Sequence, residues 1–148
     1  MPNPGVTLAQ VEIAPSLFTW PAEQPQLIGS RCDSCAALTF PVQSHCPSCG
    51  GTTSEHHLPR TGTLHTWTTQ EFPPVAPPYL TPVGKEFQPY GIGWVDLQGE
   101  IMVEARLTEA DPAKLRFDMP VELVVIPFAT DADGNEVMTY AFAPVTEQ

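Results

Sequence analysis

Four cysteines in two closely spaced pairs constrain the fold of this 148-residue chain more than any other feature. Cys32 and Cys35 form one Cys-x2-Cys pair, and Cys46 and Cys49 form the second, with ten residues between the pairs. Each pair can form a knuckle, a tight turn that directs two thiolates towards one ion, and two facing knuckles supply the four ligands of a closed tetrahedral site. The spacing therefore predicts one structural metal ion, zinc, bound by these four cysteines.

The residues around the knuckles bear on the metal and on its role. Pro47 fixes the turn of the second knuckle and Gly50 permits positive φ after its last ligand, whereas Ala36 lacks that freedom in the first knuckle. Iron is the alternative metal, because Cys-Pro-x-Cys-Gly also suits a rubredoxin-type site, and an iron centre would make the protein an electron carrier. Four thiolates leave no open position for a catalytic zinc, and His45, beside Cys46, is expected to point away from the ion.

Charge and terminal sequence limit the expected partners and compartment. The chain has 6 basic and 17 acidic side chains and a net charge of −11. The basic residues occur singly, so the clusters that a phosphate backbone requires are missing and nucleic acid is not an expected partner. No signal-peptide pattern and no apolar run of about 18 residues is visible, which predicts a cytoplasmic protein without a membrane span. Thiols stay reduced there, which favours metal over disulfides. The basic residues are Arg31, Arg60, Lys85, Arg106, Lys114 and Arg116.

Prolines and alternating apolar residues predict a mainly β fold. The 18 prolines are spread along the chain and argue against long helices. We expect strands at 62–69, 91–97, 101–107, 121–128 and 137–142, the third with the alternation of a half-buried strand. Gln98-Gly99 is expected to form a hairpin turn, and Asp111-Pro112 to begin one short helix. Five strands with a short helix between the third and fourth is the order of an OB-fold barrel.

These elements divide the chain into three expected parts. Residues 1–26 form an N-terminal arm, residues 27–57 the zinc ribbon and residues 58–148 the five-stranded OB-fold barrel. Leu17, Phe18 and Trp20 are large apolar side chains for a free tail, so we expect the arm to pack against the rest of the protein.

The long connection at 70–90 is the candidate interaction surface. It contains six prolines, which restrict its unbound ensemble and lower the entropy lost on binding. Its apolar side chains are too many to leave in water on a domain of this size. The alternative is that the loop folds back and plugs one end of the barrel. The candidate contact residues are Phe72, Val75, Tyr79, Leu80, Phe87 and Tyr90.

Other residues that could carry chemistry have simpler explanations. His56 and His57 are adjacent in an extended segment and point to opposite sides, as surface histidines do. The segment 131–136 resembles the start of a calcium loop but has Phe142 at the twelfth position, so we expect a turn between the last two strands. Every cysteine is used by the metal, and neither a catalytic triad nor a phosphate-binding glycine loop is present. No catalytic residue is predicted.

The order of these features resembles a family of bacterial and archaeal proteins in which a rubredoxin-like zinc ribbon precedes an OB-fold. The resemblance covers about residues 25–127. It departs from the family at Ala36, where glycine is usual, and at Met119-Pro120, where a glycine tends to precede the fourth strand. The matching residues are Leu27, Gly29, Arg31, Cys32, Cys35, Phe40-Pro41, Cys46-Pro47-Ser48-Cys49, Gly62-Thr63-Leu64, Trp67, Pro89-Tyr90-Gly91 and Gly99.

The resemblance implies a non-catalytic accessory subunit of a thiolase-superfamily enzyme, either a thiolase or an acyl-CoA aldolase. The partner would carry the catalytic residues, in a heterotetramer built around a thiolase dimer. The ribbon and OB-fold subunit would stabilise it and help to enclose a bulky acyl-CoA, such as a steroid side-chain or aromatic intermediate. The acidity of this chain implies that the nucleotide end of CoA lies mainly on the partner, and that the loop at 70–90 meets the partner or the acyl portion. A nucleic-acid-binding ribbon and OB-fold protein is the further alternative.

Overall fold

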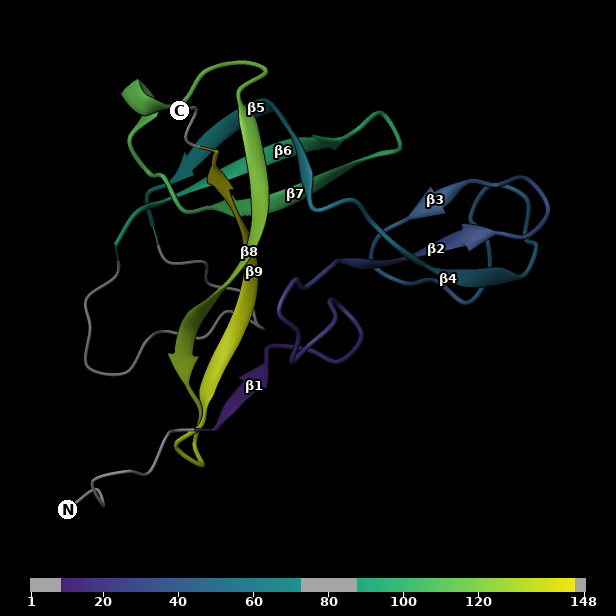
Figure 1. Cartoon of the computed structure of the whole chain (residues 1–148), viewed down its shortest axis with the longest axis horizontal. Coiled ribbons are helices and arrows are strands. Elements are labelled where there is room, and N and C mark those ends of the chain that lie inside the picture. Colours follow the sequence, from purple (N-terminus) through teal and green to yellow (C-terminus); the bar gives the residue numbers. More distant parts are fainter. Residues whose placement is uncertain (1–8, 73–87, 146–148) are drawn as a thin grey trace.

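The computed structural model describes residues 9–72 and 88–145 and consists of a small three-stranded ribbon beside a larger barrel (Figure 1). The ribbon sheet has the order β3-β2-β4, and the larger sheet has the order β1-β9-β7-β6-β5-β8, closed by pairing of β9 with β8. In chain order the elements are β1 (Gln10–Glu12), β2 (Ile28–Cys32), β3 (Leu38–Thr39), β4 (Thr53–His57), β5 (Thr61–Gln70), β6 (Tyr90–Leu97), β7 (Ile101–Leu107), the 3-10 helix η1 (Pro112–Lys114), β8 (Pro120–Thr130) and β9 (Glu136–Pro144).

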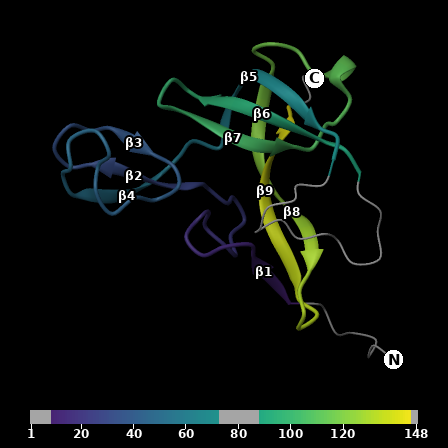
Figure 2. The ribbon, with the colours of Figure 1, turned by 180° about the vertical axis from the view of Figure 1, so that it is seen from behind.

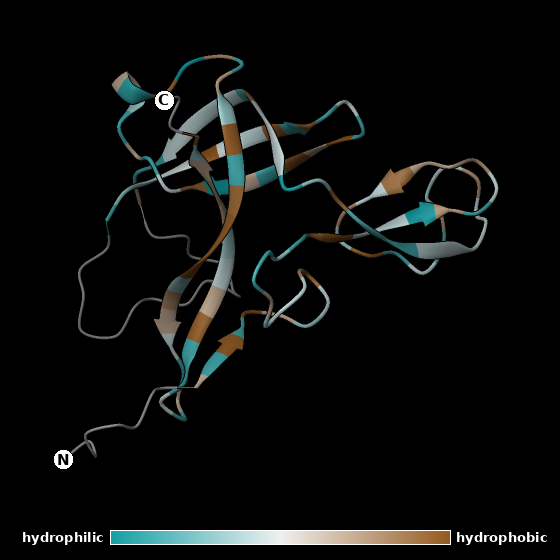
Figure 3. Ribbon diagram, viewed as in Figure 1, coloured by the Kyte–Doolittle hydropathy of each residue, from teal (hydrophilic) through white to brown (hydrophobic). Residues whose placement is uncertain are grey.

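The five strands from β5 to β9 form the predicted OB-fold barrel, so the expected mainly β class is confirmed. In β7 the buried residues Val103, Ala105 and Leu107 alternate with more exposed ones, as the sequence pattern predicts. Figure 3 shows apolar residues on the strands of the barrel. The core of the barrel is formed by side chains from every barrel strand, by two leucines that flank the ribbon strands, and by one residue of the arm. They include Phe18, Leu27, Leu58, Leu64, Val95, Leu97, Val103, Leu107, Val121, Leu123 and Phe142.

The predicted hairpin turn and the predicted short helix are both present in the barrel. Gln98 and Gly99 both have positive φ, 58° and 75°, as a tight hairpin turn requires, and the Glu100 N–H donates to the Leu97 carbonyl at 3.1 Å. The Asp111 carboxylate accepts from the Ala113 N–H at 2.9 Å and begins the short helix. That helix is a single 3-10 turn.

The last hairpin is longer than the sequence indicates. Strands β8 and β9 pair from Val121 with Pro144 as far as Thr130 with Glu136, and a bulge near Pro127 breaks the register. The bulge accommodates Pro127 within β8, since proline is tolerated in a strand where the ladder is interrupted. Their distal ends extend beyond the barrel, where β1 lies alongside β9 in parallel (Figures 1 and 2). The predicted turn at 131–135 closes this hairpin, with the Asp131 carboxylate accepting from two backbone N–H groups.

The N-terminal arm packs against the rest of the protein, as expected. Phe18 is 1% exposed and lies edge-on to Trp20 and Tyr140, with ring centroids 6.3 and 6.4 Å apart. Tyr140 on β9 also lies edge-on to Phe40 of the ribbon, at 5.7 Å. One aromatic cluster therefore joins the arm, the ribbon and the barrel.

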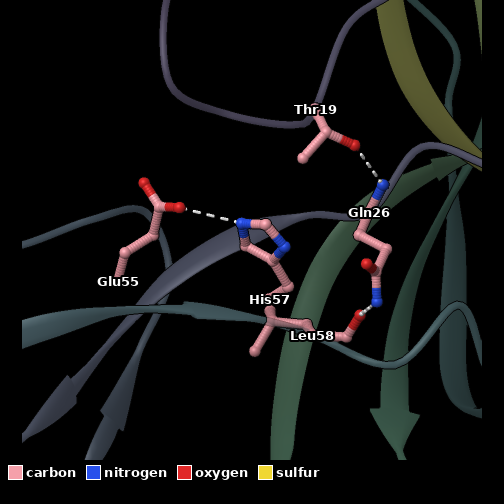
Figure 4. A network of polar contacts seen from close by, with 5 residues as sticks. All are labelled: Thr19, Gln26, Glu55, His57 and Leu58. Atoms are coloured by element: carbon pink, nitrogen blue, oxygen red, sulfur yellow. Dashed lines mark hydrogen bonds and ion pairs between the residues drawn. The ribbon is translucent and has the colours of Figure 1, made fainter. Parts of the chain in front are cut away.

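Polar contacts reinforce this junction. Figure 4 shows Gln26 bridging the arm and the segment after β4. Its backbone N–H donates to Thr19 Oγ1 at 3.0 Å, and its side-chain amide donates to the Leu58 carbonyl at 3.2 Å. Arg60 donates to the carbonyls of Pro25 and Leu123, which ties the arm to β8. Among the described residues, no helix is long and apolar enough to cross a membrane.

Candidate metal centre and contact surface

The two knuckles bring the four cysteine sulfurs together at the far end of the ribbon. The sulfurs all lie within 4.8 Å of one another, with Cys32 and Cys49 3.4 Å apart and Cys35 and Cys46 3.7 Å apart. Thiolates at the corners of a tetrahedron around zinc, with Zn–S distances of about 2.3 Å, lie about 3.8 Å apart. The four cysteines singled out from the sequence can therefore hold one tetrahedral zinc ion.

Backbone N–H groups donate to the sulfur of the buried cysteine in each knuckle, Cys32 or Cys46. Those of Ser34 and Cys35 lie 3.4 Å from Cys32 Sγ, and that of Ser48 lies 3.4 Å from Cys46 Sγ. The hydrogen bonds from Cys35 and then Ser34 lower the pKa of Cys32 to about 6, because they stabilise the thiolate. The knuckle backbone thus favours the charged ligand form at neutral pH.

The pKa of Cys49, the exposed cysteine of the second knuckle, shifts in the opposite direction. The Gly51 N–H lowers the pKa of Cys49, but the neighbouring Cys32 and Cys35 sulfurs raise it by more, and the pKa of Cys49 is about 12. Four thiolates this close repel one another, so they cannot all ionise without a cation among them. A metal ion held by Cys32, Cys35, Cys46 and Cys49 would supply that cation and cross-link the two knuckles.

The turns after each pair differ from the sequence expectation at one position. Gly50 has φ of 76°, as expected, but Ala36 also adopts the left-handed region, with φ of 63°. The Ala36 N–H donates to the Cys32 carbonyl at 3.1 Å, and the Gly50 N–H donates to the Cys46 carbonyl at 2.8 Å. The two knuckles are therefore alike in backbone geometry. Alanine accepts this conformation at a cost of about 1–2 kcal/mol.

Asp33 connects the first knuckle to the opposite strand. Its carboxylate accepts from Ser54 Oγ at 2.6 Å and from Thr52 Oγ1 at 3.0 Å. The bond from Ser54, and to a smaller extent that from Thr52, holds the pKa of Asp33 below its ordinary value. The Asp33 N–H also donates to the Thr52 carbonyl at 2.9 Å. Side-chain and backbone contacts therefore tie the first knuckle to β4 and the residue before it.

The histidines lie outside the sulfur cluster. His45 is exposed, and among the residues that the structure describes the group of metal-ligand side chains consists of the four cysteines. His57 Nε2 lies 2.9 Å from a Glu55 carboxylate oxygen, whereas His56 Nε2 lies 3.5 Å from Glu100 on the β6–β7 turn. The adjacent pair thus contacts different neighbours and offers no shared site.

The candidate contact surface is only partly within the described residues. Phe72, two residues after the end of β5, is 76% exposed, and Tyr90 is half-buried at the start of β6. Trp94 and Met102 on β6 and β7 are also exposed, at 43% and 41%, and were not singled out from the sequence. Both are apolar residues at positions of β6 and β7 where the alternation predicts exposed, polar residues. That mismatch could have revealed them from the sequence. The other predicted contacts, Val75, Tyr79, Leu80 and Phe87, lie outside the described residues.

Two family models match consecutive parts of the chain. The rubredoxin-like zinc ribbon domain of ChsH2 matches residues 19–55, and the C-terminal OB-fold domain of ChsH2 matches residues 55–126. The chain belongs to this family. The resemblance seen in the sequence is therefore confirmed, and the sulfur cluster lies within the part of the chain that matches the ChsH2 zinc ribbon.

Related proteins align with almost the whole chain. The benzoylsuccinyl-CoA thiolase subunit BbsA of Thauera aromatica is 33% identical over 134 residues, 88% of this chain and 86% of that protein. A DUF35 domain-containing scaffold protein of Pyrococcus furiosus is 31% identical over 125 residues, 83% of this chain and 86% of its own. A solved chain of the Ltp2-ChsH2(DUF35) aldolase shares the fold, with a TM-score of 0.59 at 24% identity, covering 82% of this chain and 86% of that one.

Proposed function

We propose that this chain is a non-catalytic accessory subunit of a thiolase-like enzyme that acts on acyl-CoA. The observation that carries the proposal is the 33% identity to a thiolase subunit, BbsA, along nearly the full length of both chains. The chemistry of the chain is consistent with it, because the four cysteines of the sequence all lie in the sulfur cluster. A cysteine held by zinc is not available as a nucleophile for acyl transfer.

The proposal has several finer parts. The chain stabilises a catalytic thiolase or retro-aldolase subunit in a heterotetramer around a thiolase dimer, in the cytoplasm. The shared interface encloses a bulky acyl-CoA, such as a steroid side-chain or aromatic-catabolism intermediate. The arm (1–26), ribbon (27–57) and OB-fold (58–148) act as one unit, with one structural zinc on Cys32, Cys35, Cys46 and Cys49. The zinc cross-links the ribbon and takes no part in the reaction.

Isolation of the native complex tests this proposal. The full chain, carrying an affinity tag, is purified from its own host under mild salt, and co-purifying chains are identified by mass spectrometry. We expect a thiolase-superfamily subunit, with its own catalytic cysteine and histidine, in a fixed ratio to this chain. Recovery of a stoichiometric redox partner or of nucleic acid in its place would overturn the proposal in favour of an electron carrier or a nucleic-acid-binding protein.

Truncation of Phe72 tests the contact surface. Phe72→Ala should weaken assembly with the catalytic subunit, or raise the acyl-CoA KM of the complex, by about fivefold or more, as for an interface anchor. Because Phe72 is 76% exposed, its loss should change the unfolding free energy by less than about 0.5 kcal/mol. Assembly is measured by titrating the two purified subunits, and stability by the melting temperature of the isolated chain.

Val42→Ala is the control for this experiment. Val42 is an exposed apolar residue of the ribbon, 42% accessible, and its truncation should leave both measurements unchanged. The opposite pattern for Phe72→Ala, a lowered melting temperature with assembly intact, would show that the loop at 70–90 plugs the barrel and is not a contact surface.

A further inference from the structure

The barrel has an open seam between β7 and β9. These strands pair only where Leu107 meets Phe142, and no other pairing between them is found in residues 9–72 and 88–145. Towards its N-terminal end β7 diverges from β9 (Figure 1). A pocket of about 430 Å³ lies in this seam, which is within the size range of small-ligand sites. Its walls come from four strands and are formed by Tyr90, Ile92, Glu104, Ala105, Arg106, Phe128, Thr139 and Tyr140.

Arg106 is held in this pocket by two aromatic rings. Its guanidinium carbon lies 4.2 Å from the ring centre of Tyr90 and 5.8 Å from that of Phe128. Aromatic faces orient the plane of a guanidinium and leave its N–H edge available for hydrogen bonds. Within the described part of the chain, Arg106 makes neither an ion pair nor a hydrogen bond.

This arrangement is unusual for a chain of such composition. The protein carries a net charge of −11 and has only 6 basic residues, so acidic partners for an arginine are abundant. Glu104 lies two residues before Arg106 on β7 and lines the same pocket, yet the two form no ion pair. A planar donor fork that is oriented by packing and has no carboxylate of its own is suited to a carboxylate from elsewhere.

Two residues of β9 complete the lining. Thr139 and Tyr140 come from β9, on the other side of the seam from Arg106. Burial raises the pKa of Tyr140 above its ordinary value near 10, and the negative charge of Glu104 raises it further. The phenol is therefore protonated at neutral pH and can donate a hydrogen bond to an anion.

We infer that the pocket between β7 and β9 binds a carboxylate carried on a planar apolar group, with Arg106 as its bidentate partner. The hydroxyl of Tyr140 supplies a further hydrogen bond. The rings of Tyr90 and Phe128 contact the apolar body. The carboxylate comes either from the acyl group of a substrate or from a side chain of the catalytic subunit, and both sources present the same chemistry to Arg106.

The charges of the pocket restrict the ligand further. Glu104 repels a second negative charge, so a monocarboxylate is favoured over a dianion or a phosphate ester. The volume is large enough for a single ring with its carboxylate. The pocket is therefore a site for an acyl-sized acid and not for the phosphates of CoA.

A titration of the isolated, isotope-labelled full chain with benzoate tests the inference. We expect saturable NMR shifts of the backbone amides of Ala105, Arg106 and Thr139, with an affinity in the millimolar range, as for one bidentate contact. Benzamide, the neutral analogue, and inorganic phosphate should bind about tenfold more weakly or not at all. Absence of saturable shifts, or equal binding of benzamide, would overturn the inference.

Three charge variants give the matched comparison. Arg106→Gln should weaken benzoate binding about tenfold or more, whereas Arg116→Gln, which removes the same charge from an exposed residue outside the pocket, should not change it. Glu104→Gln should tighten binding severalfold, a gain that damage to the fold could not produce. Benzoate binding unchanged in Arg106→Gln, or weakened in Glu104→Gln, would contradict the assigned roles.

The same titration of the assembled complex identifies the source of the carboxylate, and this arm alone rests on the proposed function. If the catalytic subunit supplies it, benzoate no longer shifts the pocket amides in the complex, and Arg106→Gln weakens assembly. If a substrate supplies it, benzoate still binds to the complex and assembly is unchanged. Either result supports a carboxylate site, and the result with the isolated chain stands whether or not the partner is a thiolase.

Discussion

Cys49→Ser is expected to abolish ordered structure in residues 27–51 and to give largely insoluble protein. The variant leaves three thiolates for zinc, and metal binding by such ribbons is part of their folding, with an apparent free energy of about 10–16 kcal/mol for structural zinc sites. The ribbon has little else to replace this energy, since its strands β2, β3 and β4 span only 5, 2 and 5 residues. Loss of the ribbon should also disturb the barrel, because Phe40 packs on Tyr140.

Elemental analysis and NMR measure this outcome. Native protein should contain one zinc per chain and no iron, and Cys49→Ser should lose the zinc together with the dispersed amide signals of the ribbon. Ser48→Ala is the matched control, because its N–H bond to the Cys46 sulfur comes from the backbone and survives the change. Stoichiometric iron in native material, which colours a ferric thiolate site red, or a folded ribbon without metal would refute the zinc assignment.

Gly62→Ala is expected to destabilise the barrel strongly although it adds a single methyl group. A Cβ at Gly62 would lie 2.3 Å from the Asp96 carbonyl oxygen and 3.0 Å from the Leu97 side chain. The carbonyl belongs to the backbone of the neighbouring strand β6 and cannot move away without breaking the sheet. Overpacking of this kind costs about 1–3 kcal/mol, and a backbone obstacle places the cost at the upper end.

Thermal unfolding of the full chain is the measurement for this prediction. A loss of about 3 kcal/mol should lower the melting temperature by about 6–12 °C in a domain of this size. Thr63→Ala is the control, since Thr63 is exposed beside Gly62 and its truncation should shift the melting temperature by about 2 °C or less. An unchanged melting temperature for Gly62→Ala would mean that β5 and β6 do not approach as closely as described.

The parts of the fold that depend on local patterns could be predicted from the sequence. The alternation at 101–107 and the Gln98-Gly99 turn each require only a few neighbouring residues, and both appear in the structure. The knuckles are likewise local, because each is a turn of four residues with its own backbone hydrogen bonds. Even Ala36 follows the knuckle geometry against its own preference, since the surrounding hydrogen bonds determine its conformation.

The parts that depend on distant residues could not be predicted in this way. Strand β1 has only three residues and no period, and it exists because the free edge of β9 accepts it. The pocket is a second case. Sequence reasoning treated Arg106 as one of six scattered basic residues, and its meaning depends on Tyr90, Phe128 and Tyr140, which the barrel brings together from three other strands.

The central claim, that this chain serves a thiolase-like enzyme without catalysing the reaction itself, is tested most directly by a turnover measurement. The full zinc-loaded chain, the co-purifying catalytic subunit and the two together are assayed for cleavage of a panel of acyl-CoA esters, with released products quantified by mass spectrometry. We predict no turnover by this chain alone and activity that depends on both subunits. Turnover by this chain alone, retained through rigorous removal of contaminating enzymes, would contradict the account.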